Sequence, residues 1–86
     1  MKITETARFR TSLNALSNKQ LVKLKKRFGL FFQNIFHPSL RTEKLEPKHK
    51  NIWSFRMDKS YRVIFTFTDK ETILLLDIGS HDIYRK

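Results

Sequence analysis

Two arginines in the second half of the chain, Arg56 and Arg62, have the residue type and the spacing to bind a phosphate group. The sequence around them alternates apolar and polar residues on both sides of a short polar break, which predicts a β-hairpin. If Met57 lies opposite Tyr61, the apolar faces of the two strands coincide and Arg56 lies across from Arg62 on the other face. Like charges placed opposite each other destabilise a strand pair. The pair therefore indicates that an anion, with phosphate the obvious candidate, binds at this face.

Composition predicts one small domain that binds a polyanion. The chain has 86 residues, of which 40% are hydrophobic, and only two Gly and two Pro, so we expect a single packed domain over residues 1–86. Eighteen Lys and Arg against eight Asp and Glu give a net charge of +10. This excess points first to a nucleic acid and second to a membrane surface.

Several classes of protein are excluded at this stage. No apolar run approaches the roughly 20 residues of a membrane span, and no signal-peptide pattern opens the chain, so we expect a cytoplasmic protein. The chain lacks Cys, which excludes disulfides and thiolate metal sites. Its three His, at 37, 49 and 81, do not have metal-ligand spacing, and no Gly-rich phosphate loop occurs. We therefore expect neither a metal nor another cofactor.

The first half of the chain predicts a strand and two helices. Lys2–Glu5 is a short candidate strand, and Ala7–Leu16 has apolar residues at helical spacing after Thr6, a plausible N-cap. Ser17 can cap a second helix, which has a lysine-rich surface and ends before Pro38 because the residue preceding proline avoids the helical region. These segments predict an N-terminal helical hairpin.

The second half predicts a basic connection and a sheet. Residues 38–50 are polar and strongly basic, and Gly79 is expected to end the last strand. The run 73–76 does not alternate, which predicts burial on both faces. Three consecutive strands are expected at Ile52–Met57, Tyr61–Thr68 and Thr72–Ile78. The fold class is therefore α+β, with the N-terminal helical hairpin packed on a small, mainly antiparallel β-sheet.

These motifs together resemble the RelE/ParE superfamily of type II toxin–antitoxin toxins, in particular the RelE/StbE-like branch with YafQ- and YoeB-like messenger RNA interferases. The resemblance covers nearly the whole chain and lies in the segments 36–45, 53–56, 61–65 and 75–84. It implies a ribosome-dependent endoribonuclease that cuts messenger RNA in the decoding site. It also implies a cognate antitoxin as partner, and the net charge predicts that an acidic segment of this antitoxin covers a basic groove of the toxin.

The resemblance also implies roles for single residues. Arg62 falls on a phosphate-contacting arginine, and Arg56 falls where related toxins have a basic residue. His81 falls on the catalytic histidine of YafQ-like members, and Tyr84 is similar to the terminal aromatic of such sites. Many relatives have histidine at the position of Glu43, in the loop 36–45. It is therefore an open question whether this loop supplies a base in this chain.

The chemistry fits these residue types. Attack by a ribose 2′-hydroxyl needs a base, cations around the phosphorane and an acid at the leaving oxygen. Arginine matches phosphate oxygens, His81 can transfer a proton near neutral pH, and Tyr84 can stack on an unstacked base. His49 is a possible substitute for the loop base. Diffuse RNA-phosphate contacts are expected from Lys44, Lys48, His49 and Lys50.

Alternatives remain for the residues and for the function. Arg62 could instead pair with Asp58 or Asp77, and His81 could cap a strand end, while Trp53 is best explained as a core residue. A ParE-like toxin, which inhibits DNA gyrase by protein contact, has the same fold, as does a degenerate toxin that keeps only antitoxin binding. Fold alone does not choose among them, although the paired arginines and His81 favour the nuclease.

Overall fold

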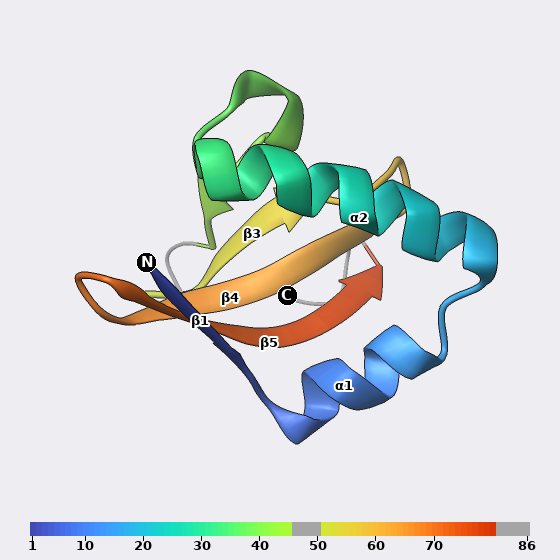
Figure 1. Ribbon diagram of the computed structural model, residues 1–86, viewed down its shortest axis with the longest axis horizontal. Coiled ribbons are helices and arrows are strands. Elements are labelled where there is room, and N and C mark those ends of the chain that lie inside the picture. Colours follow the sequence, from blue (N-terminus) through green and yellow to red (C-terminus); the bar gives the residue numbers. More distant parts are fainter. Residues whose placement is uncertain (46–50, 81–86) are drawn as a thin grey trace.

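The computed structural model describes residues 1–45 and 51–80 as two helices on a five-stranded sheet (Figure 1). The strand order is β1-β5-β4-β3-β2, with β1 parallel to β5 and the other neighbours antiparallel. This arrangement confirms the predicted α+β class. The elements in chain order are β1 (Lys2–Glu5), α1 (Ala7–Asn14), α2 (Asn18–Gln33), a short 3₁₀ helix η1 (Pro38–Leu40), β2 (Glu43–Lys44), β3 (Trp53–Arg56), β4 (Tyr61–Asp69) and β5 (Thr72–Ser80).

Both helices begin at the predicted caps. The Thr6 hydroxyl accepts a hydrogen bond from the Phe9 backbone N–H at 3.0 Å, and Ser17 forms a reciprocal capping box with Gln20. The second helix ends at Gln33, earlier than the proline predicts. Asn34 is extended, and its side-chain oxygen accepts a hydrogen bond from the Phe36 N–H at 3.0 Å, which replaces the next helical turn.

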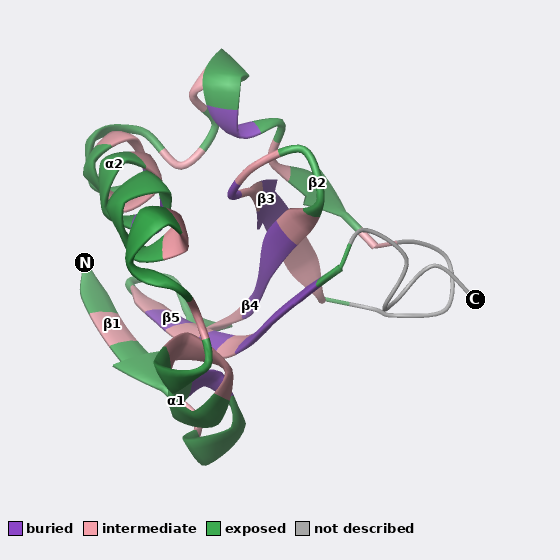
Figure 2. Ribbon diagram, turned by 90° about the vertical axis from the view of Figure 1, so that its right-hand side faces the viewer, coloured by how far each residue is buried: buried purple, intermediate pink, exposed green. Residues whose placement is uncertain are grey.

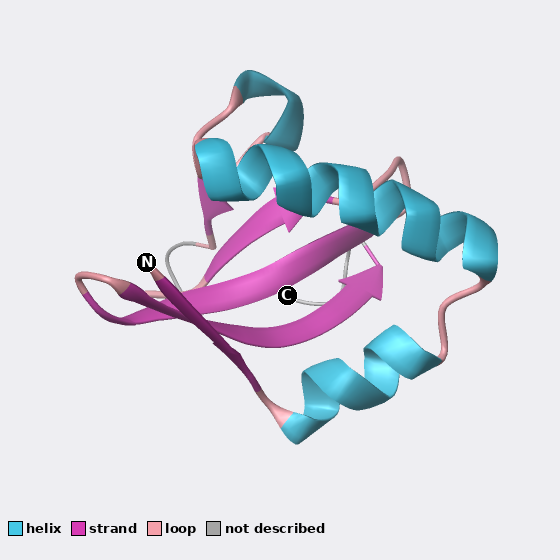
Figure 3. Ribbon diagram, in the orientation of Figure 1, coloured by secondary structure: helices cyan, strands magenta, loops and turns pink. Residues whose placement is uncertain are grey.

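The core lies between α2 and the middle of the sheet. Phe31 is fully buried, and its ring lies 4.6 Å from that of Phe55 on β3 and 5.2 Å from that of Phe65 on β4, measured between centroids. Figure 3 shows α2 crossing these two strands, and in Figure 2 the buried segments follow β3, β4 and β5. Aromatic packing of this kind fixes the position of α2 relative to the β3–β4 hairpin.

The first helix is attached to β5 by a buried carboxylate. Asp77 is 3% exposed and accepts hydrogen bonds from the Ser12 hydroxyl at 2.5 Å and from Arg8 Nε at 3.0 Å. An apolar groove of about 460 Å³ separates α1 from α2. The residues that line this apolar groove are Ile3, Glu5, Phe9, Leu13, Leu21, Leu24, Lys25, Phe28, Phe32 and Leu75.

The sheet differs from the prediction in three places. The last strand continues to Ser80 instead of ending at Gly79, because both residues pair with the start of β4. Leu74 and Leu76 are only half-buried, so the prediction of burial on both faces is wrong. The two-residue strand β2 was not predicted, since Glu43 and Lys44 have low strand propensity and are held by pairing with β3.

The turn between β4 and β5 forms where the sequence predicts it. The Glu71 backbone N–H donates to Asp69 Oδ1 at 2.8 Å, and this hydrogen bond lowers the pKa of the Asp69 carboxyl. Within residues 1–45 and 51–80, neither helix has the length and apolar character needed to cross a membrane.

Candidate functional site

The predicted arginine pair is present in the β3–β4 hairpin. Arg56 lies opposite Arg62 in the strand register, and Phe55 lies opposite Val63 in the core. The Met57 backbone N–H donates to the Tyr61 carbonyl at 3.0 Å and closes the hairpin at the expected position. The alternation of apolar and polar residues therefore predicted this register correctly, because a shift by one residue would expose the core face.

Arg62 is held in place by its neighbours. Its side chain is 9% exposed, and Nε donates to the Ser54 hydroxyl at 2.7 Å. Its Nη2 donates to the Arg41 carbonyl at 2.6 Å and lies 3.8 Å from Glu43 Oε1. A buried guanidinium with fixed partners keeps one orientation and loses little entropy when an anion binds.

The partners of Arg62 come from the segment before β3. Arg41 follows η1 and adopts the left-handed conformation, with φ 48° and ψ 47°, a strained region for a residue with a side chain. Glu43 pairs with Ser54 across β2 and β3, which places its half-exposed carboxylate beside Arg62. This segment therefore provides both a carbonyl and a carboxylate to the arginine.

Arg56 is less enclosed than its cross-strand partner. It is half-buried, and its Nε donates to the Asp58 carbonyl at 3.3 Å. The Asp58 carboxylate accepts hydrogen bonds from the Ser60 and Tyr61 backbone N–H groups, both at 2.8 Å. Asp58 therefore stabilises the hairpin turn, and among the described residues it is Glu43 rather than Asp58 or Asp77 that forms an ion pair with Arg62.

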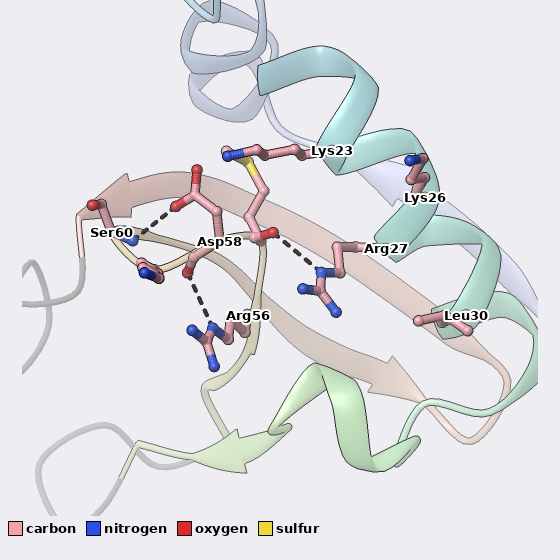
Figure 4. A pocket seen from close by; sticks show the side chains of 9 residues that line it. Lys23, Lys26, Arg27, Leu30, Arg56, Asp58 and Ser60 are labelled. Atoms are coloured by element: carbon pink, nitrogen blue, oxygen red, sulfur yellow. Dashed lines mark hydrogen bonds between the residues drawn. The ribbon is translucent and has the colours of Figure 1, made fainter. Parts of the chain in front are cut away.

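Arg56 also lines a basic groove between α2 and the β3–β4 turn (Figure 4). This groove has a volume of about 820 Å³. Arg27 reaches from α2 toward the hairpin, with Nε donating to the Met57 carbonyl and Nη1 to the Ser39 carbonyl, both at 3.2 Å. The residues that line this basic groove are Lys23, Lys26, Arg27, Leu30, Arg56, Met57, Asp58, Lys59 and Ser60.

The remaining predicted residues fall into two groups. Lys44 is exposed on β2, and its ammonium lies 6.0 Å from the centroid of the Trp53 ring. Trp53 packs against the core between Phe36 and Phe67, which confirms its interpretation as a core residue. Outside the described residues lie Lys48, His49, Lys50, His81 and Tyr84, whose roles stay predictions.

The described residues offer the elements of phosphate chemistry. Arg62 presents an oriented cation, Arg56 a second cation near it, and Glu43 a carboxylate that can accept a proton. Sequence reasoning did not identify the contributions of Ser54 or of the Arg41 carbonyl. A serine on the polar face of a core strand is a weak signal, and a backbone carbonyl gives none. Within residues 1–45 and 51–80, no three His, Asp or Glu side chains gather as a metal site would require.

Solved structures of bacterial and archaeal toxins have the same fold. A YoeB/ParE toxin from Agrobacterium tumefaciens is 14% identical in sequence, with a TM-score of 0.77 over 94% of this chain and 99% of that one. YafQ from E. coli strain BL21(DE3) is 17% identical, with a TM-score of 0.75 over 93% and 92%. The archaeal RelE–RelB complex from Pyrococcus horikoshii OT3 contains a chain that is 14% identical, with a TM-score of 0.73 over 95% and 96%.

Sequence comparison adds the family. No curated protein sequence matches the chain. The profile of a family described as the RelE-like toxin of the type II toxin–antitoxin system HigB matches residues 31–79, which is more than half of the 86 residues. The matched segment includes the arginine pair, Glu43 and the hairpin that positions them. The chain therefore belongs to the HigB-like family of RelE-like toxins of type II toxin–antitoxin systems.

Proposed function

We propose that this toxin is an endoribonuclease that cleaves messenger RNA on the ribosome and thereby inhibits translation. The observation that carries the proposal is the fixed guanidinium of Arg62, which lies across from Arg56 and beside the carboxylate of Glu43. A cation held before the reaction can stabilise charge that develops in the transition state without reorganising. The net charge of +10 supports an RNA substrate.

The residues suggest a division of roles in cleavage. Glu43 accepts the proton of the ribose 2′-hydroxyl, whose oxygen attacks the adjacent phosphorus, while the bond from phosphorus to the 5′-oxygen breaks. Arg62, assisted by Arg56, neutralises the phosphorane, and His81 protonates the leaving oxygen. Tyr84 stacks on a base next to the scissile bond. The products are a 2′,3′-cyclic phosphate and a 5′-hydroxyl.

We propose Glu43 as the base, whose identity the sequence left open. Its side chain is 50% exposed, so the carboxylate can turn from Arg62 toward a bound ribose. Proton transfer to Glu43 requires accurate placement of the 2′-oxygen in line with the leaving group. We propose that the ribosome, which holds the message in the decoding site, supplies this placement.

Expression of the toxin without an antitoxin is expected to arrest growth by cutting translated messages. Primer extension on cellular messenger RNA should show new 5′ ends within reading frames after induction, and a start-codon variant of the same message should stay intact because it is not translated. DNA supercoiling is measured in the same cells. Intact messages together with gyrase-linked DNA breaks would contradict the proposal and favour a ParE-like toxin.

The apolar groove between α1 and α2 suits the partner of such a toxin. The solved RelE–RelB complex shows that one structurally similar chain assembles with another protein. On this chain, Phe32 and Leu21 line the apolar groove and are 56% and 37% exposed. We propose that an amphipathic segment of the cognate antitoxin packs its apolar face here, as helices do in hydrophobic grooves.

Phe32→Asp is expected to weaken antitoxin binding by at least about 10-fold, because a charge replaces an aromatic contact in the groove. Val22→Asp is the matched control, since Val22 is also 56% exposed on α2 but does not line the apolar groove. The measurement is co-purification of the antitoxin followed by calorimetric titration. Equal losses in both variants, or none in Phe32→Asp, would place the antitoxin elsewhere.

A further inference from the structure

The basic groove is lined by several cations that have no role in the proposed cleavage. We infer that it is a separate binding site for the sugar–phosphate backbone of RNA, which it contacts without reading the sequence. Of the residues that line it, only Arg56 has a role in the proposed cleavage. Binding in this groove requires no chemistry, so the inference extends beyond cleavage and stands if the toxin proves not to be a nuclease.

Cations lie on both walls of the basic groove (Figure 4). Lys23 and Lys26 extend from successive turns of α2, whereas Arg56 and Lys59 belong to the hairpin on the other side. An RNA strand that runs between the two walls of the groove would have basic side chains on both sides. Phosphate contacts of this kind position a nucleic acid and contribute affinity without base specificity.

These cations are not neutralised within the described part of the chain. The ion pairs among residues 1–45 and 51–80 are Arg8–Asp77, Arg10–Glu5 and Arg62–Glu43, and none of them uses a groove cation. Among the described residues, a carboxylate lines the groove at Asp58 alone, and it already accepts hydrogen bonds from two backbone N–H groups of the turn. The groove thus has an excess of positive charge that an external anion can neutralise.

Different residues of α2 line the basic groove and the apolar groove. This separation favours RNA over an acidic protein segment as the ligand of the basic groove. Leu24, Phe28 and Phe32 line the apolar groove, whereas Lys23, Lys26 and Arg27 line the basic groove. An amphipathic protein partner needs apolar contacts, and these are concentrated in the apolar groove. A phosphodiester backbone needs mainly cations, which are concentrated in the basic groove. Arg56 connects this groove to the arginine pair, so one RNA strand can reach both.

The test is binding of RNA to the free toxin, followed by fluorescence anisotropy over a range of salt concentrations. The probe is a labelled single-stranded RNA of about 12 nucleotides, fully 2′-O-methylated so that it cannot be cleaved. In the triple variant Lys23→Gln, Lys26→Gln and Lys59→Gln, the slope of log K against log salt should become shallower by about 2, because each lost contact to single-stranded RNA removes about 0.7. Binding near 0.1 M salt should weaken about 100-fold.

Two further variants distinguish RNA binding in the basic groove from nonspecific electrostatic attraction to the whole toxin. The first is Lys19→Gln, Lys25→Gln and Lys70→Gln, which removes three exposed charges outside the basic groove and should leave the slope nearly unchanged. The second replaces the three groove lysines with arginine and should retain binding. Equal losses in the two glutamine variants would overturn the inference, and so would tighter, groove-dependent binding of polyglutamate than of RNA. Melting temperatures verify that each variant is folded.

Discussion

Arg62→Ala is expected to lower the single-turnover rate of message cleavage on programmed ribosomes by about 10²–10³-fold, because it removes the charge positioned for the phosphorane. The same substitution should also reduce the melting temperature by roughly 5–15 °C, since it leaves buried partners without their donor. The effect on stability is expected to be large for a single polar residue. The 9% exposure of the Arg62 side chain and its hydrogen bonds to Ser54 and Arg41 account for this effect.

Ser54→Ala is the control that separates the two effects. It removes the hydroxyl that accepts from Arg62 Nε and costs stability, yet it keeps the guanidinium in the site. At a temperature where both variants are folded, Ser54→Ala should retain most of its activity and Arg62→Ala should not. Arg56→Ala should have a milder effect than Arg62→Ala, because its side chain is less fixed. If all three variants cleave at the same rate, the arginine pair has no role in the mechanism.

Glu43→Gln is expected to lower the cleavage rate by about 10²–10⁴-fold with little change in melting temperature. The amide keeps the size of the side chain but cannot accept the proton of the 2′-hydroxyl, and the half-exposed carboxylate contributes little to stability. The measurement is single-turnover cleavage of a message on programmed ribosomes, beside the melting temperature of each variant.

The matched control for this substitution is Glu71→Gln, an exposed glutamate in the β4–β5 turn. This substitution removes a charge of the same sign at the opposite end of β4 from Arg62, and it should leave the cleavage rate unchanged. If Glu43→Gln cleaves at the normal rate, Glu43 is not the base and its function is to hold Arg62. In that case His49 becomes the next residue to substitute.

Local patterns were sufficient to predict the hairpin and both helix starts. Alternation fixes which side chains of β3 and β4 face the core, and closure of the hairpin between Met57 and Tyr61 then places Arg56 opposite Arg62. Thr6 and Ser17 were predicted as caps because their hydroxyls can satisfy free N–H groups at a helix start. In each of these cases, the determining interactions connect residues that are close in sequence.

The surroundings of Arg62 depend on contacts between distant segments, and the sequence did not reveal them. The left-handed conformation of Arg41 directs a carbonyl to an arginine 21 residues later, which no periodicity predicts. Pairing across β2 and β3 places Glu43 beside that arginine, although a two-residue polar strand has no sequence signal. The basic groove was also missed, because the charges of α2 meet those of the hairpin only after packing.

Cleavage by purified components tests the central claim most directly. A labelled message is incubated with the toxin either alone or bound to ribosomes with a codon in the decoding site, and the fragments are resolved at nucleotide resolution. We predict a cut in the decoding-site codon only on ribosomes, with a 2′,3′-cyclic phosphate end, and no cut with Arg62→Ala. A message that stays intact on ribosomes, while the same toxin inhibits supercoiling by purified gyrase, would contradict the account.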